Sequence, residues 1–315
     1  MNTVSVVMAT YNGEKYIYEQ LESLKSQNYK IDEVVICDDC STDNTKKIVL
    51  EFIRDNNLTW WHFIQNNENY GYAKNFINAV KKSKGDIVFF CDQDDIWNNE
   101  KIYTMLSIIK KNNNINLLCS NLELYYSDDC GRKWDKKDLK DMNNSGDVES
   151  RRFDEKNFFV QRSGCTMCFR REFFEKISSY WVDNWAHDDF MWKFACITDT
   201  NFVLQKFLMK RRMHNDNTSS IKVRTKQWRK EQIKDLIRQL ESLQIFSEKE
   251  KVNYKYKKII SKNLRCLKCR YKFIDSKNPI YLLTILIKYI KCFPRMKALL
   301  LDIYITYIGT YRGVN

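Results

Sequence analysis

Val88-Phe89-Phe90-Cys91-Asp92-Gln93-Asp94-Asp95-Ile96-Trp97 is an apolar run of strand length that stops at three carboxylates within four positions, and an aromatic residue closes it. Short apolar runs rich in β-branched and aromatic residues are typical of buried strands. Ligands of open α/β sheets gather outside the carboxyl ends of such strands. Carboxylates crowded there repel one another unless a cation lies among them, and hard oxygen ligands suit Mg²⁺ or Mn²⁺. The alternative is a solvated acidic turn, because Asp is a common turn residue.

Strand-like and helix-like segments alternate from the N-terminus to this stretch and beyond it. The predicted strands are 3–9, 33–37, 60–64 and 86–91, and the predicted helices include 14–27, 72–82 and 98–111. Repeated βαβ units predict an α/β fold, a mostly parallel Rossmann-like sheet with helices on both faces. Two of the strands end in carboxylate clusters, at Asp38-Asp39 and at the opening stretch, and a third ends in Asn12-Gly13. Polar groups gathered at one sheet edge are what a nucleotide site requires.

The pattern continues more weakly after residue 111. Residues 117–126 predict a further strand, and 202–204 and 207–209 predict two short ones. Residues 127–150 are polar, charged and aperiodic, which predicts a mobile loop over the site. The pattern changes beyond residue 220, so we assign residues 1–220 to one α/β domain with a nucleotide site at its sheet edge; the resemblance described below implies that this domain is catalytic.

Composition places the chain among globular proteins. It has 315 residues, 43% of them hydrophobic, with only 2 Pro and 8 Gly, which allows one large or two ordinary domains. It contains 11 cysteines, and a strand begins at Val4 where a secretory signal would need a longer charged and apolar leader. Both features predict a cytoplasmic protein with free thiols.

Positive charge is concentrated in the C-terminal third. Residues 221–315 carry 23 Lys and Arg against 7 Asp and Glu, a net charge of +16, which leaves −3 for residues 1–220. Two long helical stretches, about 226–246 and 248–273, precede an apolar end at 280–308 that Lys and Pro residues interrupt. We predict a basic helical region over 221–315 that meets an anionic surface, membrane or nucleic acid.

The interrupted end is too broken for a membrane span, which needs about 20 mostly apolar residues. Basic residues beside Leu, Ile, Tyr and Phe predict helices that lie in the membrane interface. Helices packed on the catalytic domain are the alternative. No recognised nucleic-acid module is present, although 254–270 mixes aromatic with basic residues. We therefore expect a membrane surface as partner and no nucleic acid.

Four polar segments together resemble a known family. They are Tyr11-Asn12, Asp38-Asp39-x-Ser41-Thr42-Asp43, Asn69-x-Gly71 with Asn75, and Asp92-x-Asp94-Asp95. In this order and spacing they resemble the family 2 glycosyltransferases, which have the GT-A fold, over roughly residues 3–220. Three further runs resemble the branch of rhamnosyltransferases and related surface-polysaccharide enzymes: Asp-Gln-Asp-Asp-Ile-Trp, Trp185-x-His187-Asp188 and Arg212-x-His214-x-x-Asn217-x-Ser219.

The resemblance implies a role for each matching residue. Asp94, with His214, is implied to hold the Mg²⁺ or Mn²⁺ that bridges the donor diphosphate, and Asp188 is implied to be the catalytic base. Asp38 is implied to accept a hydrogen bond from N3–H of uracil or thymine. The other implied nucleotide-binding residues are Thr10, Tyr11, Asn12, Asp39, Asn75, Asp92 and Gln93. Those implied for the sugar, acceptor or diphosphate are Asp95, Trp97, Gly164, Cys165, Thr166, His187, Arg212 and Asn217.

General chemistry agrees with these roles. Loss of a nucleoside diphosphate builds negative charge that a divalent cation neutralises, and an acceptor hydroxyl needs a base. Arg211 and Arg212 supply fixed positive charge for phosphate oxygens. We predict an inverting, metal-dependent glycosyltransferase that moves one sugar from a UDP- or dTDP-sugar to a glycan or lipid-linked acceptor in surface polysaccharide synthesis, at the inner face of the cell membrane. The chain lacks the Gln-x-x-Arg-Trp segment of processive synthases.

Two positions depart from the usual pattern of the family. Cys40 stands where Gly is usual, which we expect to be tolerated with a negative φ. His187 stands where Glu more often precedes the catalytic Asp. Asp188 has a structural alternative too, because Asp is a good helix N-cap.

Other functions and sites are also compatible with parts of the sequence. A sugar-nucleotide pyrophosphorylase shares the fold class, but 10–15 is not the Gly-rich basic loop that it needs. A non-catalytic glycan- or nucleic-acid-binding module is the second rival. Three Cys-x-x-Cys pairs, Cys37/Cys40, Cys165/Cys168 and Cys266/Cys269, lie too far apart in sequence to suggest a zinc site.

Overall fold

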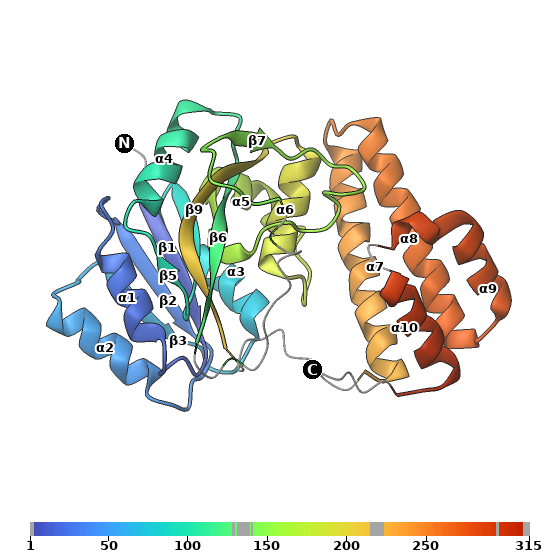
Figure 1. Cartoon of the computed structure of the whole chain (residues 1–315), viewed down its shortest axis with the longest axis horizontal. Helices are drawn as coiled ribbons and strands as arrows, with labels where there is room; N and C mark the ends of the chain where they lie inside the picture. The colour runs from blue at the N-terminus through green and yellow to red at the C-terminus, as the bar shows by residue number, and fades with distance from the viewer. Residues whose placement is uncertain are drawn as a thin grey trace. The chain divides into compact units, whose positions relative to one another are not determined.

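The structure is a computed structural model, and it describes residues 3–127, 130, 139, 141–214, 224–293 and 296–310. Asn217 and much of the predicted mobile loop at 127–150 lie outside these residues. The chain forms two compact units (Figure 1). The first comprises Met1–Arg152, Val160–Ser179 and Ala186–Asn215, and the second comprises Phe153–Phe159, Tyr180–Trp185 and Asp216–Asn315. Two short segments of the first 220 residues thus belong to the second unit.

The first unit is built on a mixed sheet of nine strands among the described residues, in the order β3-β2-β1-β4-β8-β6-β9-β5, with β7 paired to β9. The strands are β1 (Val4–Thr10), β2 (Glu33–Asp38), β3 (Trp61–Gln65), β4 (Ile87–Asp92), β5 (Ile96–Trp97), β6 (Leu117–Tyr126), β7 (Val148–Ser150), β8 (Met167–Arg170) and β9 (Asn201–Met213). The pairings of β3, β2, β1 and β4 are parallel, and β8 runs antiparallel to both β4 and β6. This confirms the predicted α/β fold with a mostly parallel sheet.

Helices cover both faces of this sheet (Figure 1). They are α1 (Ile17–Lys25), α2 (Thr45–Asp55), α3 (Tyr72–Lys82), α4 (Lys101–Lys111), α5 (Arg171–Ser178) and α6 (His187–Ile197), with a short 3₁₀ turn, η2 (Gly164–Thr166). Alternate residues of a strand face opposite sides, so each central strand needs two apolar faces. Met8, Ile36 and Phe89 face the α1, α2 and α4 side, and Phe90 contacts Phe76 of α3 on the other.

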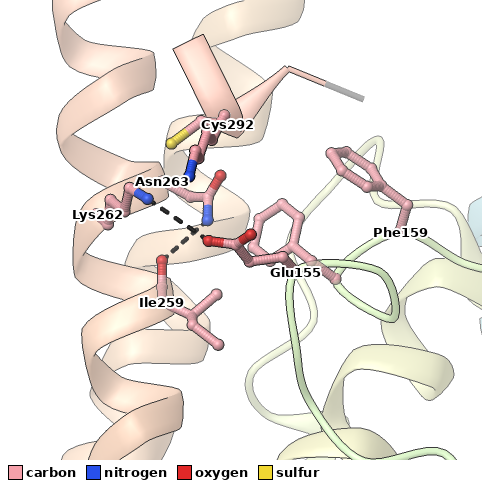
Figure 2. Close-up of a pocket in the computed structure, with 8 residues that line it drawn as sticks. Glu155, Phe159, Ile259, Lys262, Asn263 and Cys292 are labelled. Carbon is pink, nitrogen blue, oxygen red and sulfur yellow. Dashed lines mark hydrogen bonds and ion pairs between the residues drawn. The ribbon is translucent and has the colours of Figure 1, made fainter. Parts of the chain in front are cut away.

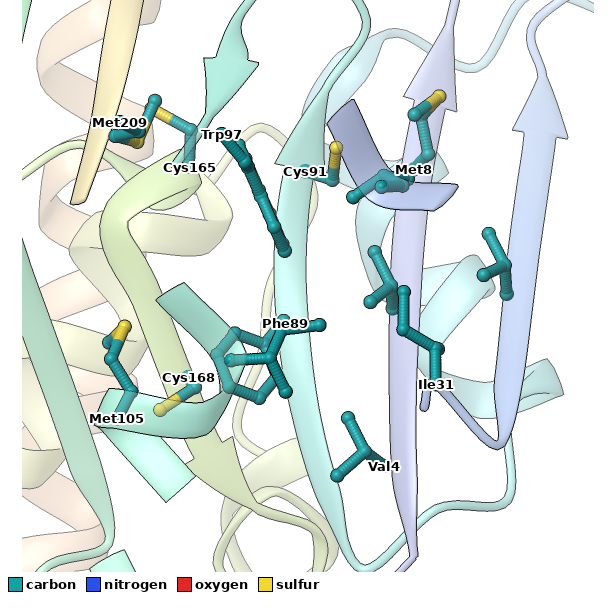
Figure 3. Close-up of a cluster of buried hydrophobic side chains, with 14 of the residues drawn as sticks. Val4, Met8, Ile31, Phe89, Cys91, Trp97, Met105, Cys165, Cys168 and Met209 are labelled. Atoms are coloured by element: carbon teal, nitrogen blue, oxygen red, sulfur yellow. The ribbon is translucent and has the colours of Figure 1, made fainter. Parts of the chain in front are cut away.

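The core on the α1 side explains why the opening stretch is so apolar. Phe89 and Cys91 of β4 pack there with Val4 and Met8 of β1, all fully buried (Figure 3). Trp97 of β5 belongs to the same cluster, with its ring centroid 6.0 Å from that of Phe89. The acidic turn is therefore anchored on both sides by strands whose apolar side chains are buried in this core.

Most predicted elements of the first unit occur within a few residues of their predicted bounds. The helix at 72–82 has the predicted ends. The prediction of two short strands at 202–204 and 207–209 was wrong, because Asn201–Met213 is one strand. Register shifts in its pairing with β6 near Cys119 and Asn121 bend it, and such bulges break the regular alternation that the prediction used.

The second unit is helical in its described C-terminal part. It contains α7 (Lys226–Lys249), α8 (Tyr254–Ser276), α9 (Pro279–Thr284), a π-helical turn η3 (Ile285–Tyr289), a 3₁₀ turn η4 (Ile290–Cys292) and α10 (Met296–Tyr307). Asp302 of α10 is buried and accepts from Nε of Arg229 in α7 and Nε of Arg270 in α8, each at 2.7 Å. One carboxylate thus joins three helices. Among the described helices, none combines the length and the apolar character that crossing a bilayer demands.

Candidate active site

The carboxyl ends of three neighbouring strands bring the predicted polar residues to one edge. Thr10 of β1 is in register with Asp38 of β2, and Ala9 of β1 is in register with Asp92 of β4. The two acidic turns therefore flank the end of β1, as the strand order β2-β1-β4 requires. Ligands bind at such a position in open α/β sheets.

The β2 turn uses its first carboxylate to hold its own backbone. Asp38 is fully buried, and its Oδ1 accepts from Thr10 Oγ1 at 2.9 Å and from Ser41 Oγ at 2.5 Å. Its Oδ2 accepts from the Ser41 amide at 2.9 Å. Hydrogen bonds to an ionised acceptor are stronger than those between neutral groups. Asp38 thus fixes the turn that connects β2 to α2.

Asp39, the next residue, holds a second loop. Its Oδ2 accepts from the Gly71 amide at 2.8 Å, and its Oδ1 accepts from Asn66 Nδ2 at 2.9 Å. Asn75 is buried as well, and its Nδ2 donates to the carbonyl of Cys37 at 2.8 Å. These contacts bring the Asn69-x-Gly71 segment beside the β2 turn.

Cys40 adopts a φ of 64°, so the negative φ under which we expect a Cys to be tolerated here is not present. The left-handed region favours Gly, which explains why Gly is the usual residue here. The Cys40 thiol donates to the carbonyl of Asn66 at 3.1 Å. Asn12 is also left-handed, with a φ of 48°, and its Oδ1 accepts from the Thr42 amide at 2.9 Å. Asn12 therefore ties the β1 turn to the β2 turn.

Gln93 ties the β1 turn to the β4 turn. Its Oε1 accepts from the Tyr11 amide at 2.8 Å and its Nε2 donates to the Tyr11 carbonyl at 3.0 Å. A Cβ on Gly13 would lie 2.4 Å from Gln93 Oε1, so a larger residue at this position would displace the Gln93 amide. The Tyr11 side chain is 49% exposed at the edge of the sheet. An exposed aromatic ring on a fixed backbone can stack on a nucleotide base.

The β4 turn differs from the β2 turn because its carboxylates face one another. Burial, and then the charge of Asp94, raise the pKa of Asp92 to about 6. The same two causes raise the pKa of Asp95 well above its usual value. Asp95 Oδ1 accepts from the Arg212 amide at 3.1 Å, whereas its buried Oδ2 has no hydrogen-bond partner. This turn has more negative charge than its hydrogen bonds neutralise.

Asp94 and His214, predicted as metal ligands, lie together. Asp94 Oδ2 is 2.8 Å from His214 Nε2, although they are 120 residues apart in sequence. The His214 ring lies 4.6 Å from the ring of Tyr16. His214 directly follows β9, and β9 therefore carries it to the β4 turn.

The two adjacent arginines of β9 have different surroundings. The Arg212 guanidinium pairs with Glu19, donates to the Asp94 carbonyl, and lies 4.8 Å and 4.9 Å from the rings of Tyr16 and Tyr125. Arg212 therefore stabilises the backbone of the acidic turn. Arg211 donates to Ser163 Oγ at 2.9 Å, and its charge opposes the raised pKa values of Asp92, Asp95 and Asp188.

Asp188 is the second residue of α6 and reaches the same edge. Its Oδ1 accepts from the amide of Asp189 at 2.8 Å. Burial, and then the charge of Asp189, raise its pKa to about 6, and Arg211 opposes this shift. Ala186 occupies the N-cap position of α6 and makes no side-chain cap. Asp188 is therefore not the N-cap of α6.

His187, the first residue of α6, packs inward. Its ring lies 4.0 Å from the ring of Phe76 and 4.6 Å from that of Phe90. Neither ring nitrogen has a hydrogen-bond partner, and burial lowers its pKa to about 3. A Cβ on Gly164 would lie 2.2 Å from His187 Nε2. The neutral imidazole thus sets the distance between α6 and the η2 turn.

The η2 turn is otherwise buried. Thr166 Oγ1 donates to the Ser163 carbonyl at 2.7 Å, and Cys165 Sγ lies within 4.8 Å of carboxylate oxygens of Asp92 and Asp95. The structure places Trp97, predicted for sugar or acceptor, in the core and away from the edge. The other described candidates lie in the turns at the carboxyl ends of β1, β2 and β4, or in the parts of α3, α6, η2 and β9 that contact these turns.

Lys101 was missed in the sequence because it reads as one of many helix lysines. It is fully buried, donates to the Cys165 carbonyl at 2.5 Å, and lies 3.7 Å from the Trp97 ring. Burial lowers its pKa to about 8. The chain turns between β5, which ends at Trp97, and α4, which begins at Lys101, so the spacing of these two residues gave no signal in the sequence.

The residues of the β4 turn fit a divalent cation. Asp92, Asp94, Asp95 and His214 supply the hard oxygens and the imidazole that such ions accept. The Asp95 oxygen without a hydrogen-bond partner and the raised pKa values of Asp92 and Asp95 fit a site that binds added positive charge.

Comparison with known proteins agrees with this geometry. The sequence pattern of glycosyl transferase family 2 matches residues 5–178. The chain is 32% identical over 227 residues to the dTDP-rhamnosyl transferase RfbG of Shigella flexneri, covering 67% of this chain and 72% of RfbG. It matches several further curated glycosyltransferases over less than half of their own length.

Two solved structures share the fold. Residues 1–349 of TarS from Staphylococcus aureus, in complex with UDP-GlcNAc, give a TM-score of 0.63 at 20% identity, covering 92% of this chain and 79% of that one. The mannosyltransferase PcManGT from Pyrobaculum calidifontis, in complex with GDP-Man and Mn²⁺, gives 0.58 at 17% identity, covering 96% and 79%. The fold and the edge site define a GT-A enzyme. The chain belongs to glycosyl transferase family 2 and is a glycosyltransferase.

Proposed function

We propose that this glycosyltransferase is inverting, metal-dependent and non-processive, and that it moves one sugar from a UDP- or dTDP-sugar to a glycan or lipid-linked acceptor of a surface polysaccharide. Residues 1–220 would supply the catalytic domain. The observation that carries the proposal is the β4 edge. Asp95 has an oxygen without a hydrogen-bond partner there, Asp94 pairs with His214, and the charge of Arg211 lowers the pKa of Asp92, Asp95 and Asp188.

Asp94 and His214 would hold Mg²⁺ or Mn²⁺, with Asp92 and Asp95 beside them. The bound ion would neutralise the charge that builds on the departing diphosphate. Arg211 carries a permanent charge among the same carboxylates and would bind diphosphate oxygens. Arg212 would act indirectly, because its guanidinium already pairs with Glu19 and the Asp94 carbonyl.

Asp188 would take the proton from the acceptor hydroxyl as that oxygen attacks the anomeric carbon. A carboxyl with a pKa of about 6 is mostly ionised at neutral pH, and it is a stronger base than an ordinary carboxylate. The attack breaks the bond between the sugar and the diphosphate in a single displacement. The configuration at the anomeric carbon therefore inverts, and no covalent intermediate with the enzyme is needed. His187 and Gly164 would fix the position of Asp188.

The donor would lie across the ends of β1, β2 and β4. Tyr11 offers an exposed ring for the base, while Asn12, Asp38, Asp39, Asn75 and Gln93 fix the turns around it. Thymine and uracil share the N3–H edge, which is why both dTDP and UDP donors fit. RfbG supports the first, and the complex of TarS with UDP-GlcNAc supports the second.

The C-terminal helices would meet the membrane that presents a lipid-linked acceptor. Several large apolar side chains of the second unit are exposed: Ile280, Leu283, Leu286, Ile287, Leu300, Tyr307 and Ile308. After Asp275 the sequence has one acidic residue, Asp302, which is buried between two arginines. Lys277, Lys288, Lys291 and Lys297 are exposed in the same segment. Apolar groups with basic neighbours fit an anionic lipid surface.

A nucleotide-sugar panel with Mg²⁺ or Mn²⁺, scored by the released nucleotide, tests the reaction. We expect nucleoside diphosphate from a UDP- or dTDP-sugar once an acceptor is present. Release of pyrophosphate from a nucleoside triphosphate and a sugar phosphate would support the pyrophosphorylase alternative instead. Binding without turnover across donors and acceptors would support a glycan-binding protein.

Sedimentation with vesicles tests the membrane partner separately. We expect the chain to sediment with phosphatidylglycerol vesicles at low salt, and less with phosphatidylcholine vesicles. Ile287→Glu should weaken this association because it puts a charge on the apolar surface. No sedimentation with anionic vesicles at any salt concentration would contradict the membrane proposal.

A further inference from the structure

The segment Tyr180–Trp185 leads directly into α6, the helix that carries Asp188. This segment belongs to the second unit and α6 belongs to the first, and Ala186 joins them. Ala186 is the N-cap of α6, and its side chain makes no capping hydrogen bond. A first turn without a cap leaves backbone amides without partners, so its residues move more freely. The position of Asp188 therefore depends on what holds the chain just before α6.

Helix α7 holds this segment near both of its ends. Ser242 Oγ donates to the carbonyl of Tyr180, and Gln239 Nε2 donates to the carbonyl of Asn184 at 3.5 Å. Both α7 side chains are buried. The Tyr180 ring also packs edge-on against the ring of Phe246, with the ring centroids 5.2 Å apart. Because a buried donor that loses its acceptor costs free energy, these contacts resist movement of the segment.

Asn184 makes the turn from which the chain enters α6. Its φ of 65° lies in the left-handed region, which is unfavourable for residues with a Cβ although Asn adopts it more readily than most. Its Nδ2 donates to Asp235 Oδ2 of α7 at 3.3 Å. Trp181 Nε1 donates to the Trp185 carbonyl at 2.9 Å across the same turn. An unfavourable φ persists where the surrounding contacts determine it, so α7 helps to fix this turn.

Helix α8 holds a second segment, Phe153–Phe159, less tightly. The Phe153 ring lies 5.8 Å from the ring of Tyr256 of α8. A small pocket lies between this segment and residues of α8 and η4, and an ion pair crosses it (Figure 2). Lys262 Nζ is 3.6 Å from Glu155 Oε1, and the two side chains are 36% and 64% exposed. Exposed ion pairs contribute little, so the contacts of α7 are the stronger of the two sets.

We propose that α7 positions Asp188 for catalysis through Tyr180–Trp185, with Gln239 and Ser242 as positioning residues. This role rests on the proposed function, in which Asp188 is the base. Both α7 residues act through the chain that enters α6, because their donors are used by its carbonyls. Misplacing a reacting group by about 1 Å can lower a rate by about a hundredfold. Loss of these contacts should therefore lower kcat far more than it weakens the binding of donor or metal.

Gln239→Met combined with Ser242→Ala removes both donors and tests this role in the whole chain. We expect kcat for release of nucleoside diphosphate, from the UDP- or dTDP-sugar that the wild type uses, to fall by about 10- to 100-fold. The KM for that donor and the affinity for Mn²⁺ should change by less than about threefold. This split between kcat and KM is the signature of a displaced base, because a general loss of folded protein would not depend on which contact was removed.

Gln244→Met combined with Ser247→Ala is the matched control on the same helix. It removes the same two residue types, but Gln244 donates to Glu248 and Ser247 donates to the Gln244 carbonyl, so both hydrogen bonds lie within α7. Ser247 is buried, so this variant also reports the cost of changing the interior of the second unit. We expect it to keep the kcat of the wild type when circular dichroism shows that both double variants are folded.

Three outcomes would overturn the proposal. The first is a wild-type kcat in the variant of Gln239 and Ser242, and the second is an equal fall of kcat in the control. The third is a wild-type kcat in Asp188→Asn, which would remove the base and so contradict the proposed function as well. A fall in Asp188→Asn with no fall in the α7 variant would contradict the positioning role alone. If the double variant fails to fold, Gln239→Met and Ser242→Ala are compared singly by the same split between kcat and KM.

Discussion

The β2 turn and the β4 turn stand at the same edge of one sheet, and each carries adjacent aspartates, yet they differ in how those carboxylates are used. Asp38 and Asp39 accept from backbone amides and from Thr10, Ser41 and Asn66. Asp95, by contrast, keeps one buried oxygen without a partner, and burial together with the charge of Asp94 raises the pKa of Asp95 and of Asp92.

The difference shows that acidic residues at a ligand-binding edge can have separate tasks. A carboxylate whose lone pairs are satisfied by the protein stabilises a loop, because its charge strengthens each hydrogen bond. A carboxylate crowded by others costs folding free energy and retains the capacity to bind a cation. We therefore assign the stabilisation of the loops to the carboxylates of the β2 turn, and the binding of a cation to those of the β4 turn.

The largest expected effect tests whether Asp188 works with the β4 turn. Asp188→Asn should lower turnover by roughly 10²- to 10⁴-fold, since it removes the base, with little change in donor binding. Steady-state release of nucleoside diphosphate measures this. Asp189→Asn is the matched control, because Asp189 pairs with Lys193 and should keep turnover within a few-fold. Equal losses in the two variants would remove Asp188 from the chemistry.

Matched substitutions in the two turns test the comparison itself. Asp38→Asn should lower the free energy of unfolding by about 1–3 kcal/mol, because an amide nitrogen would face the donors that now point at a carboxylate. Asp95→Asn should leave it unchanged or raise it, because one repelling charge disappears. Urea unfolding without divalent cations measures both. A similar loss in both variants would mean that the turns are equivalent.

The contact between Gly164 and His187 gives an effect of similar or smaller size. Gly164→Ala would place a methyl group 2.2 Å from His187 Nε2 and should cost about 1–3 kcal/mol. Adding His187→Ala should recover part of this loss, since it opens space for the methyl group. Thermal unfolding of the two single variants and the double variant forms the test. Strictly additive losses would show that the two residues do not constrain each other.

The pH profile gives the smallest predicted effect. A base with a pKa of about 6 is protonated below that pH, so kcat/KM should fall about tenfold per pH unit below 6 and level off above it. Asp189→Asn removes a neighbouring negative charge and should move this limb to lower pH. A profile that stays flat down to pH 4.5 (well below the Asp188 pKa of about 6) would contradict the role of Asp188.

Much of the first unit could be predicted from sequence because its strands are buried on both faces and its helices are amphipathic. The two adjacent arginines show the limit. Successive residues of a strand point to opposite sides, so only one of Arg211 and Arg212 can face the acidic edge. Which one depends on the pairing of Leu124 with Arg211 and of Tyr125 with Arg212, and this register arises from long-range contacts.

Other parts of the site depended on backbone shape. The positive φ of Cys40 accompanies the hydrogen bonds that the two preceding residues, Asp38 and Asp39, accept from the amides of Ser41 and Gly71, and no local preference of Cys predicts it. Trp97 follows the acidic turn directly in sequence, but β5 directs its ring into the core. Their closeness in sequence to the acidic residues predicted that Cys40 and Trp97 lie near the site, but it could not predict their backbone conformation or the direction of their side chains.

Binding of Mn²⁺ to the protein and to two variants tests the central assignment most directly. Electron paramagnetic resonance reports the free Mn²⁺ during a titration with a UDP or dTDP ligand present. We predict that Asp94→Asn loses most of the bound Mn²⁺, whereas Asp38→Asn, although less stable, retains the affinity of the wild type. Wild-type affinity in Asp94→Asn, or its loss in folded Asp38→Asn alone, would contradict the assignment of cation binding to the β4 turn.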